Sequence, residues 1–222
     1  ESGAFLFAKE ATIIVKNALF YNGTATYGGS IFAISSGISF INIRVLFGTA
    51  FLRGGGLMSL EAKSIILNNC SFRNNSAFEN GAALYLESSD FIEINNIILE
   101  SNKASLVGVL YIIGKKGVIY FIENFLCTGN KAEYGACIYQ NEGAAQISGG
   151  KVKENKENSF SLFEFKSYFS TITLNISNIE ITNNINQQIT FNLIQTLSQI
   201  KNITFQRNKG KCSLIQSEKS SI

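Results

Sequence analysis

Three six-residue segments, 81–86 (GAALYL), 91–96 (FIEINN) and 97–102 (IILESN), decide the fold of this 222-residue chain. Aliphatic and aromatic residues dominate each segment, and polar residues close each one or follow it. The residues over 92–95 alternate between apolar and polar, and this period of two is typical of a half-buried strand. Each segment is also too short for a helix of ordinary length. We therefore expect three short β-strands in this stretch.

The same pattern recurs along the chain, with anchors spaced 24 to 29 residues apart. The apolar anchors of the third strand are Phe20, Leu46, Phe72, Leu99, Cys127, Val152, Ile181 and Phe205. Five residues before each anchor stands an aliphatic residue: Val15, Ile41, Leu67, Ile94, Ile122, Ile147, Ile176 and Ile200. A repeat that cannot bury its apolar side alone must stack on its neighbours. The sequence therefore predicts one all-β domain over residues 1–222, a parallel β-helix (solenoid) of about eight coils with three short strands per coil.

Asparagine recurs at two positions of the repeat. Three residues before the anchor stand Asn17, Asn69, Asn96, Asn124, Asn178 and Asn202. Three residues after it stand Asn75, Asn102, Asn130, Asn155, Asn184 and Asn208. An inward asparagine at a corner offers a donor and an acceptor to backbone groups that have left the sheet, and stacked identical side chains can bond to one another. We therefore expect two inward-facing structural asparagine ladders.

The chain contains four cysteines, Cys70, Cys127, Cys137 and Cys212. Neighbouring coils lie about 4.8 Å apart, and a disulfide needs Cα atoms within about 7 Å. Cys70 and Cys212 lie too many coils from the others to form a bond. Only Cys127 and Cys137 are close enough, and the favoured alternative is that all four are buried thiols acting as small hydrophobic side chains. The sequence leaves this pairing open.

Two short motifs alternate through much of the chain. They occur at residues 72–75 (FRNN), 205–208 (FQRN), 28–32 (GGSIF), 81–85 (GAALY) and 135–139 (GACIY). This combination of a Phe-x-x-Asn corner with a Gly-Gly-Ala-Ile-like strand start resembles the repeat of chlamydial polymorphic outer-membrane proteins. Similar repeats occur in large surface proteins of protists. The resemblance covers most of residues 3–160 and implies a right-handed β-helix with an adhesive or structural role at the cell surface.

The composition argues against several classes of function. The net charge is only +3 and the charges are not clustered, so we expect no nucleic-acid partner. The chain has no histidine, the commonest general base and metal ligand, and its single aspartate is Asp90. We therefore predict no catalytic site, no metal and no cofactor. No run of 18 apolar residues occurs, so we expect no membrane span in this segment.

Because β-helix proteins include polysaccharide lyases and hydrolases, a carbohydrate-active enzyme or a glycan-binding module is the alternative function. A glycosidase needs two carboxyl groups held about 5–10 Å apart. Successive coils carry Glu93, Glu100, Glu123 and Glu154, but their offsets from the anchors differ, so they do not form one column. We therefore predict that the protein is not an enzyme.

The chain contains five N-glycosylation sequons, at Asn22, Asn69, Asn74, Asn175 and Asn202. Asn69 and Asn202 belong to the first expected ladder, where an inward side chain leaves no room for a glycan. Asn22 and Asn74 fall at an outward corner, and Asn175 falls at an outward strand position. We therefore expect an extracellular or cell-surface protein with N-linked glycans on Asn22, Asn74 and Asn175.

Both ends of the chain fall within the repeat, so we expect residues 1–222 to be a segment of a longer solenoid. Unpaired strand edges at the ends are templates for further pairing. Residues 5–7 (FLF) and 110–113 (LYII) are apolar throughout, so the first sheet should also present an apolar outer face. We therefore predict a rigid structural or adhesive scaffold whose partners are further coils or copies of itself, added end to end or laterally.

Overall fold

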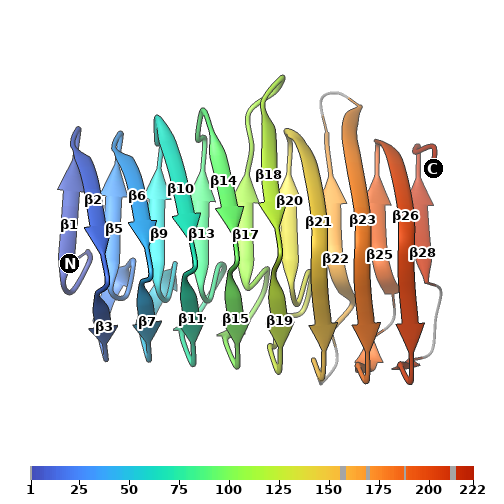
Figure 1. Cartoon of the computed structure of the whole chain (residues 1–222), viewed down its shortest axis with the longest axis horizontal. Coiled ribbons are helices and arrows are strands. Elements are labelled where there is room, and N and C mark those ends of the chain that lie inside the picture. Colours follow the sequence, from blue (N-terminus) through green and yellow to red (C-terminus); the bar gives the residue numbers. More distant parts are fainter. Residues whose placement is uncertain (1, 156–158, 169–170, 188, 211–213) are drawn as a thin grey trace.

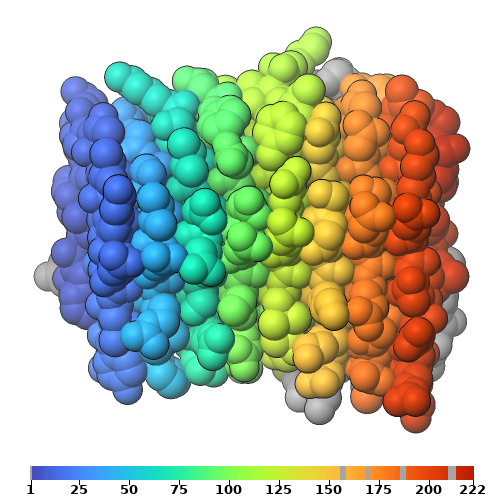
Figure 2. Space-filling model, in the orientation of Figure 1, coloured from blue at the N-terminus to red at the C-terminus, as the bar shows by residue number. Residues whose placement is uncertain are grey.

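A computed structural model describes residues 2–155, 159–168, 171–187, 189–210 and 214–222. All regular secondary structure in these ranges is β-strand, and every strand pair is parallel. The strands stack in about eight coils, as the sequence predicts. The coils advance from left to right in Figure 1, with the front strands running downward and the back strands running upward, so the solenoid is right-handed. Figure 2 shows the same coils as adjacent bands of side chains.

Sheet I, at the back of Figure 1, takes one strand from each coil and ends with one further strand, β28. Its nine strands are β1 (Leu6–Lys9), β5 (Ile31–Ile34), β9 (Leu57–Leu60), β13 (Leu84–Glu87), β17 (Leu110–Ile113), β20 (Ile138–Asn141), β22 (Ser161–Lys166), β25 (Ile189–Ile194) and β28 (Ile215–Glu218).

Sheet II, at the front of Figure 1, has two rows of strands that meet at a corner. The first row is β2 (Thr12–Lys16), β6 (Gly37–Ile41), β10 (Ser64–Asn68), β14 (Ile92–Asn95) and β18 (Ile119–Glu123). The second row is β3 (Leu19–Tyr21), β7 (Arg44–Leu46), β11 (Ser71–Arg73), β15 (Ile98–Glu100) and β19 (Leu126–Thr128). Both rows continue through the long strands β21 (Ala144–Lys153), β23 (Ile172–Thr182) and β26 (Thr196–Gln206).

A fourth short strand, which the three-strand prediction missed, occurs in each of the first four coils. These strands form sheet III: β4 (Thr24–Tyr27), β8 (Thr49–Arg53), β12 (Ser76–Ala77) and β16 (Lys103–Ala104). Near the other end, β24 (Ile185–Gln187) pairs with β27 (Lys209–Gly210). Each strand of sheet III buries one small side chain, an alanine, so it lacks the apolar pattern by which the other strands were recognised.

The core is a set of columns that run along the solenoid. In β14, Ile92 and Ile94 are buried while Glu93 between them is exposed, as the alternation predicts. Ile94 lies beside Leu67 in one neighbouring coil and Ile122 in the other, and all three are at most 1% exposed. Each coil therefore buries its apolar side chains against those of its neighbours.

The second coil differs in register from the prediction by one residue. β7 places Val45, not Leu46, in the anchor column, and β6 places Phe40, not Ile41, in the aliphatic column. Val45 and Phe40 are fully buried, whereas Leu46 and Ile41 are half-buried. The predicted register was wrong because each buried residue is followed by another apolar one, and spacing alone does not choose between them. The correction puts Asn42 three residues before its anchor.

The first set of asparagines lies at the corner between the two rows of sheet II. With Asn42 included, it comprises Asn17, Asn42, Asn69, Asn96, Asn124, Asn178 and Asn202, all with φ between 51° and 56°. All seven side chains are exposed, so the expected inward-facing ladder at this corner was wrong. The left-handed conformation interrupts the alternation of the strands and turns the side chain outward, and asparagine is among the few residues that tolerate it. Some of these amides still bond between coils, as when Asn42 Nδ2 donates to Asn17 Oδ1 (2.9 Å).

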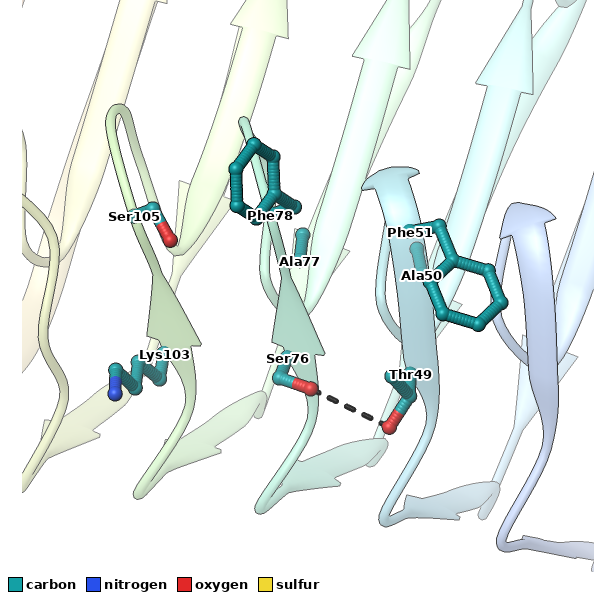
Figure 3. Close-up of a pocket in the computed structure, with 8 residues that line it drawn as sticks. All are labelled: Thr49, Ala50, Phe51, Ser76, Ala77, Phe78, Lys103 and Ser105. Atoms are coloured by element: carbon teal, nitrogen blue, oxygen red, sulfur yellow. Dashed lines mark hydrogen bonds between the residues drawn. The ribbon is translucent and has the colours of Figure 1, made fainter.

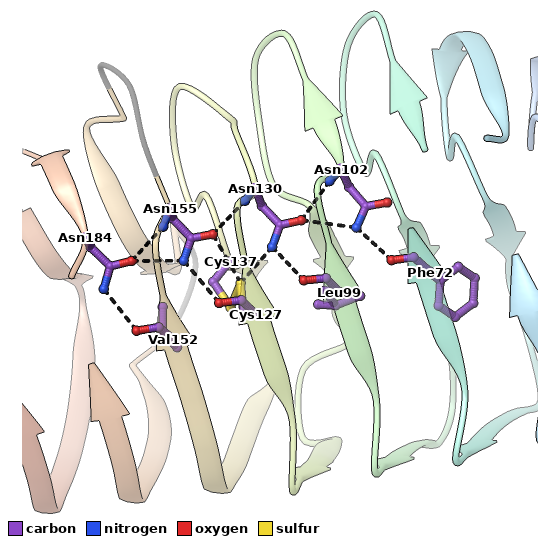
Figure 4. The surroundings of a disulfide bond; sticks show 9 residues. All are labelled: Phe72, Leu99, Asn102, Cys127, Asn130, Cys137, Val152, Asn155 and Asn184. Carbon is purple, nitrogen blue, oxygen red and sulfur yellow. Dashed lines mark hydrogen bonds between the residues drawn. A yellow bond between two sulfur atoms is a disulfide. The ribbon is translucent and has the colours of Figure 1, made fainter. Parts of the chain in front are cut away.

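The second set of asparagines lies inside the solenoid and forms a hydrogen-bonded row (Figure 4). Asn75, Asn102, Asn130, Asn155 and Asn184 are at most 1% exposed, and Asn208 is partly buried. The backbone N and Nδ2 of Asn102 donate to Asn130 Oδ1 in the next coil (2.9 and 3.1 Å). Asn102 Nδ2 also donates to the carbonyl of the preceding anchor, Phe72 (2.9 Å). We call this row the buried amide ladder.

Cys127 and Cys137 form a disulfide, with Cα atoms 5.9 Å apart. The bond links β19 to the residue that precedes β20, and both cysteines are fully buried (Figure 4). Cys70 is a free, buried thiol, and burial raises its pKa. Cys212 lies outside the described residues.

The inward side chains of the two end coils are less buried than those between them. Leu6, Val15 and Phe20 in the first coil, and Ile200 and Phe205 near the other end, are only partly covered. β1 and β28 are the outer strands of sheet I, so one edge of each pairs with no strand among the described residues.

Candidate functional site

The outer side of sheet I carries a row of large side chains from successive coils, which we call the outer stack. Its members are Phe32, Met58, Tyr85, Tyr111 and Tyr139. Tyr111 stacks on Tyr85 and on Tyr139, with ring centroids 5.0 and 4.9 Å apart. Every member is at most 9% exposed. The outer stack is therefore a second, narrow core beside the main one.

The burial of the outer stack corrects the expectation of an apolar outer face on sheet I that is open to lateral contacts. Side chains outside the stack pack against it: Tyr27, Ile34, Leu60, Val107, Ile113 and Tyr134. Phe7, which precedes Phe32 in the column, is 56% exposed because it lies in the first coil. Between Phe32 and Tyr139 the chain itself covers this face.

Cations lie over two rings of the outer stack. The Arg53 guanidinium lies 5.6 Å from the centre of the Tyr85 ring, and Lys166 Nζ lies 4.9 Å from the centre of the Tyr139 ring. Lys166 also forms an ion pair with Glu164, a carboxylate that is 2% exposed (3.4 Å). The ion pair compensates the charge of the buried Glu164 carboxylate, and the aromatic faces hold the two cations in place. Both kinds of contact therefore serve the fold.

We expect the outer stack to make the solenoid sensitive to alkali. Burial raises the pKa of Tyr111 to about 12 from its ordinary value of 10.0. The folded state therefore favours the neutral phenol, so its contribution to stability is complete below pH 10 and is lost as the pH rises toward 12. Melting curves between pH 8 and 12, with tyrosinate absorbance read in parallel, should show this loss. Tyr111→Phe should flatten the decline, and an identical decline in that variant would contradict the assignment.

The carboxylates of successive coils occupy different environments. Glu93 and Glu123 line one open hollow on sheet II. Glu100 pairs with Arg73 (3.2 Å), and Glu154 occupies a corner with φ of 56°. Within the ranges that the structure describes, no three His, Cys, Asp or Glu residues lie together as metal ligands would. Of the four glutamates, Glu93 and Glu123 thus share a hollow, while Glu100 is held in an ion pair.

A groove of about 300 Å³ lies on the outer side of sheet III (Figure 3). Phe51 and Phe78, from consecutive coils, are 62% and 69% exposed at its wall. Thr49 and Ser76 share a hydrogen bond in it (3.3 Å), and Lys103 extends beside them. Exposed aromatic faces beside hydroxyl groups and a cation suit a polar ligand with apolar patches. This groove could not be predicted from the sequence because the strands of sheet III lack a recognisable apolar pattern.

The sequon asparagines all have exposed side chains. Asn22 and Asn74 lie at the corner that leads into sheet III, with φ of 61° and 53°, and Asn175 points outward from β23. Asn69 and Asn202, which the sequence placed inside, belong to the exposed first set. The reason for excluding glycans from Asn69 and Asn202 was therefore wrong.

These features define a parallel β-solenoid with a closed core and polar corners. No protein-family model matches the chain, and no solved structure matches it. Over 130 residues, or 58% of this chain, it is 29% identical to the metabotropic glutamate receptor-like protein R of Dictyostelium discoideum. The matched stretch is 8% of that protein, so this chain is similar to a small part of a much longer one. Within the described residues, no helix has the length and apolarity to span a membrane.

Proposed function

We propose that this chain is a rigid extracellular scaffold, a structural or adhesive module of a surface protein that carries N-linked glycans. The observation that carries this proposal is the continuous parallel stack, in which each coil is bonded to its neighbours through backbone and core, and the coils from Asn75 to Asn208 also through the buried amide ladder. Such a stack resists bending along its whole length. The receptor-like name of the similar protein supports a surface context for the chain.

The five exposed sequons and the buried disulfide support passage through a secretory pathway, where both modifications are made. The chain's proposed partners are further coils or other copies of itself, which would extend the parallel sheets. An enzymatic role has less support, because the two carboxylates that share a hollow, Glu93 and Glu123, show no ring of further polar groups in that hollow beyond Asn95.

A glycan-binding role is the second candidate, and one observation favours it. The groove on sheet III combines two strongly exposed phenylalanine rings with the hydroxyls of Thr49 and Ser76 and the ammonium of Lys103. Aromatic faces pack against the apolar faces of sugars, while hydroxyl and ammonium groups bond to sugar oxygens. In this role the scaffold would itself be adhesive.

Protein purified from its natural source tests the proposed function. Peptide mass spectrometry should find N-glycans on Asn22, Asn74 and Asn175, which are exposed, whereas the equally exposed Asn69 and Asn202 donate their amides to Asn42 and Asn178. Native mass measurement of the same sample should find the chain within longer or associated solenoids. Bare asparagines at all five sequons, in a protein that stays monomeric, would contradict the proposal.

A further inference from the structure

The corner column that contains Asn22 and Asn74 also contains an unusual residue, Phe47. β7 lies between β3 and β11 in sheet II, so this column runs from Asn22 through Phe47 to Asn74. The backbone confirms the order, because the N–H of Asn22 donates to the Leu46 carbonyl (2.9 Å) and that of Phe47 to the Arg73 carbonyl (3.1 Å). Neighbouring side chains of the column are therefore about one strand spacing, ~4.8 Å, apart.

Phe47 is unlike every other member of its column. The other members are polar or glycine: Asn22, Asn74, Ser101, Gly129, Glu154, Asn183 and Arg207. All eight residues have φ between 52° and 64°, a conformation that is strained for a bulky side chain. Phe47 is also 43% exposed. Phe47 is strained, exposed and placed between two sequon asparagines. We therefore expect its ring to contact a group attached at this corner.

One side of Phe47 already has a partner. Tyr21, from the first coil, packs against it with ring centroids 5.4 Å apart and an interplanar angle of 66°. Asn74 belongs to the third coil and so lies on the opposite side of Phe47 from Tyr21. The Tyr21 contact therefore leaves the Asn74 side of Phe47 open to a further contact, and Phe47 keeps 43% of its surface exposed.

We propose that Phe47 and Tyr21 form an aromatic platform for the first N-acetylglucosamine of a glycan on Asn74. The sugar is joined to Asn74 Nδ2, one strand spacing from Phe47, so its ring begins beside the platform. The C–H groups on one face of the sugar cover the exposed part of the Phe47 ring, while its hydroxyls stay in water. This inference rests on the proposed function, because it requires a glycosylated chain.

The experiment is a double-mutant cycle on protein secreted by cells that add N-glycans, trimmed enzymatically to the first N-acetylglucosamine. Ser76→Ala removes the sequon of Asn74, and Phe47→Gly removes the ring with a residue that the column already accepts at Gly129. The hydrogen bond of Ser76 to Thr49 is lost in both Ser76→Ala arms, so its effect cancels. We expect the sugar to raise the melting temperature by about 2–4 °C with Phe47 and not with Gly at this position.

A matched cycle at Asn175 serves as the control. Its column neighbours are polar, Gln146 and Gln199, so Gln146→Ala combined with Ser177→Ala should show no coupling. A second readout is geometric. The ring protons of the sugar on Asn74 should shift upfield in nuclear magnetic resonance spectra because they lie over the Phe47 ring. Their chemical shifts should return to ordinary values in Phe47→Gly. Equal stabilisation by the sugar with and without the Phe47 ring, or unshifted sugar protons, would refute the aromatic platform but not the proposed glycosylated scaffold. Absence of sugar from Asn74 while other sequons carry it would overturn the platform too, whereas absence from all five would refute the glycosylated scaffold itself.

Discussion

Replacing Ile94 with aspartate is expected to cause the largest loss of stability of any single change considered for this protein. Ile94 is fully buried in the middle of the array, between Leu67 and Ile122. The substitution removes an apolar side chain and buries a carboxylate with no partner, so we expect a loss of more than about 4 kcal/mol. Circular dichroism should record a much lower melting temperature, and the coils on either side of the defect should melt separately.

The matched control for this change is Ile14→Asp. Ile14 is also at the middle of a strand of sheet II, in β2, but it points outward and is 64% exposed. Its replacement should cost about 1 kcal/mol or less. If the Ile94→Asp protein has the same melting temperature as the parent protein, Ile94 does not face the core and the register of the repeat is refuted.

Asn102→Ala is expected to have the second largest effect. Asn102 Oδ1 accepts hydrogen bonds from the backbone N and from Nδ2 of Asn75 (both 3.0 Å), and its own Nδ2 donates to the Phe72 carbonyl. Alanine removes the partner of the buried Asn75 N–H and one bond each from Asn75 Nδ2, which keeps the Val45 carbonyl, and from the Phe72 carbonyl. Each buried group left without a partner costs about 1–3 kcal/mol. We therefore expect a total loss of about 3–5 kcal/mol in chemical denaturation, because some groups will find new partners.

Asn96→Gly is the control for the ladder, because Asn96 belongs to the exposed first set. Its φ is 53°, which glycine adopts freely, so we expect a change within about 1 kcal/mol. Hydrogen exchange should show faster exchange at the Asn75 amide in Asn102→Ala and not in Asn96→Gly. Equal losses in the two variants would show that burial does not separate the two sets of asparagine.

The coil period and the columns of aliphatic residues were predictable because both appear as regular spacing of residue types along the chain. Spacing fails where neighbouring residues are equally apolar, as at Phe40–Ile41 and Val45–Leu46, and there the register slipped by one residue. It also does not report the backbone conformation at a corner. The outward turn of the first asparagine set follows from its left-handed φ, which the residue type permits but does not dictate.

The slipped register also hid Phe47 as a candidate functional residue. With Val45 as the anchor, Phe47 falls two residues after it, in a column otherwise made of polar residues and glycine. With Leu46 as the anchor it falls beside unrelated residues, and the sequence gives no reason to single it out. The cover over the outer stack was hidden for another reason, since Tyr27, Val107 and Tyr134 reach it from outside sheet I.

The buried amide ladder has a direction, and this matters for a chain that emerges from a ribosome N-terminus first. The asparagine of the following coil accepts, through its Oδ1, two bonds from the asparagine before it, as Asn130 Oδ1 does from the backbone N and Nδ2 of Asn102. The arriving asparagine in turn donates to the anchor carbonyl of the coil made before it, as Asn130 does to Leu99 (2.7 Å). From Asn75 onward, each newly synthesised coil thus supplies the acceptor that the preceding asparagine lacks and offers its own donors to the next coil. The ladder can therefore form coil by coil as the chain is synthesised.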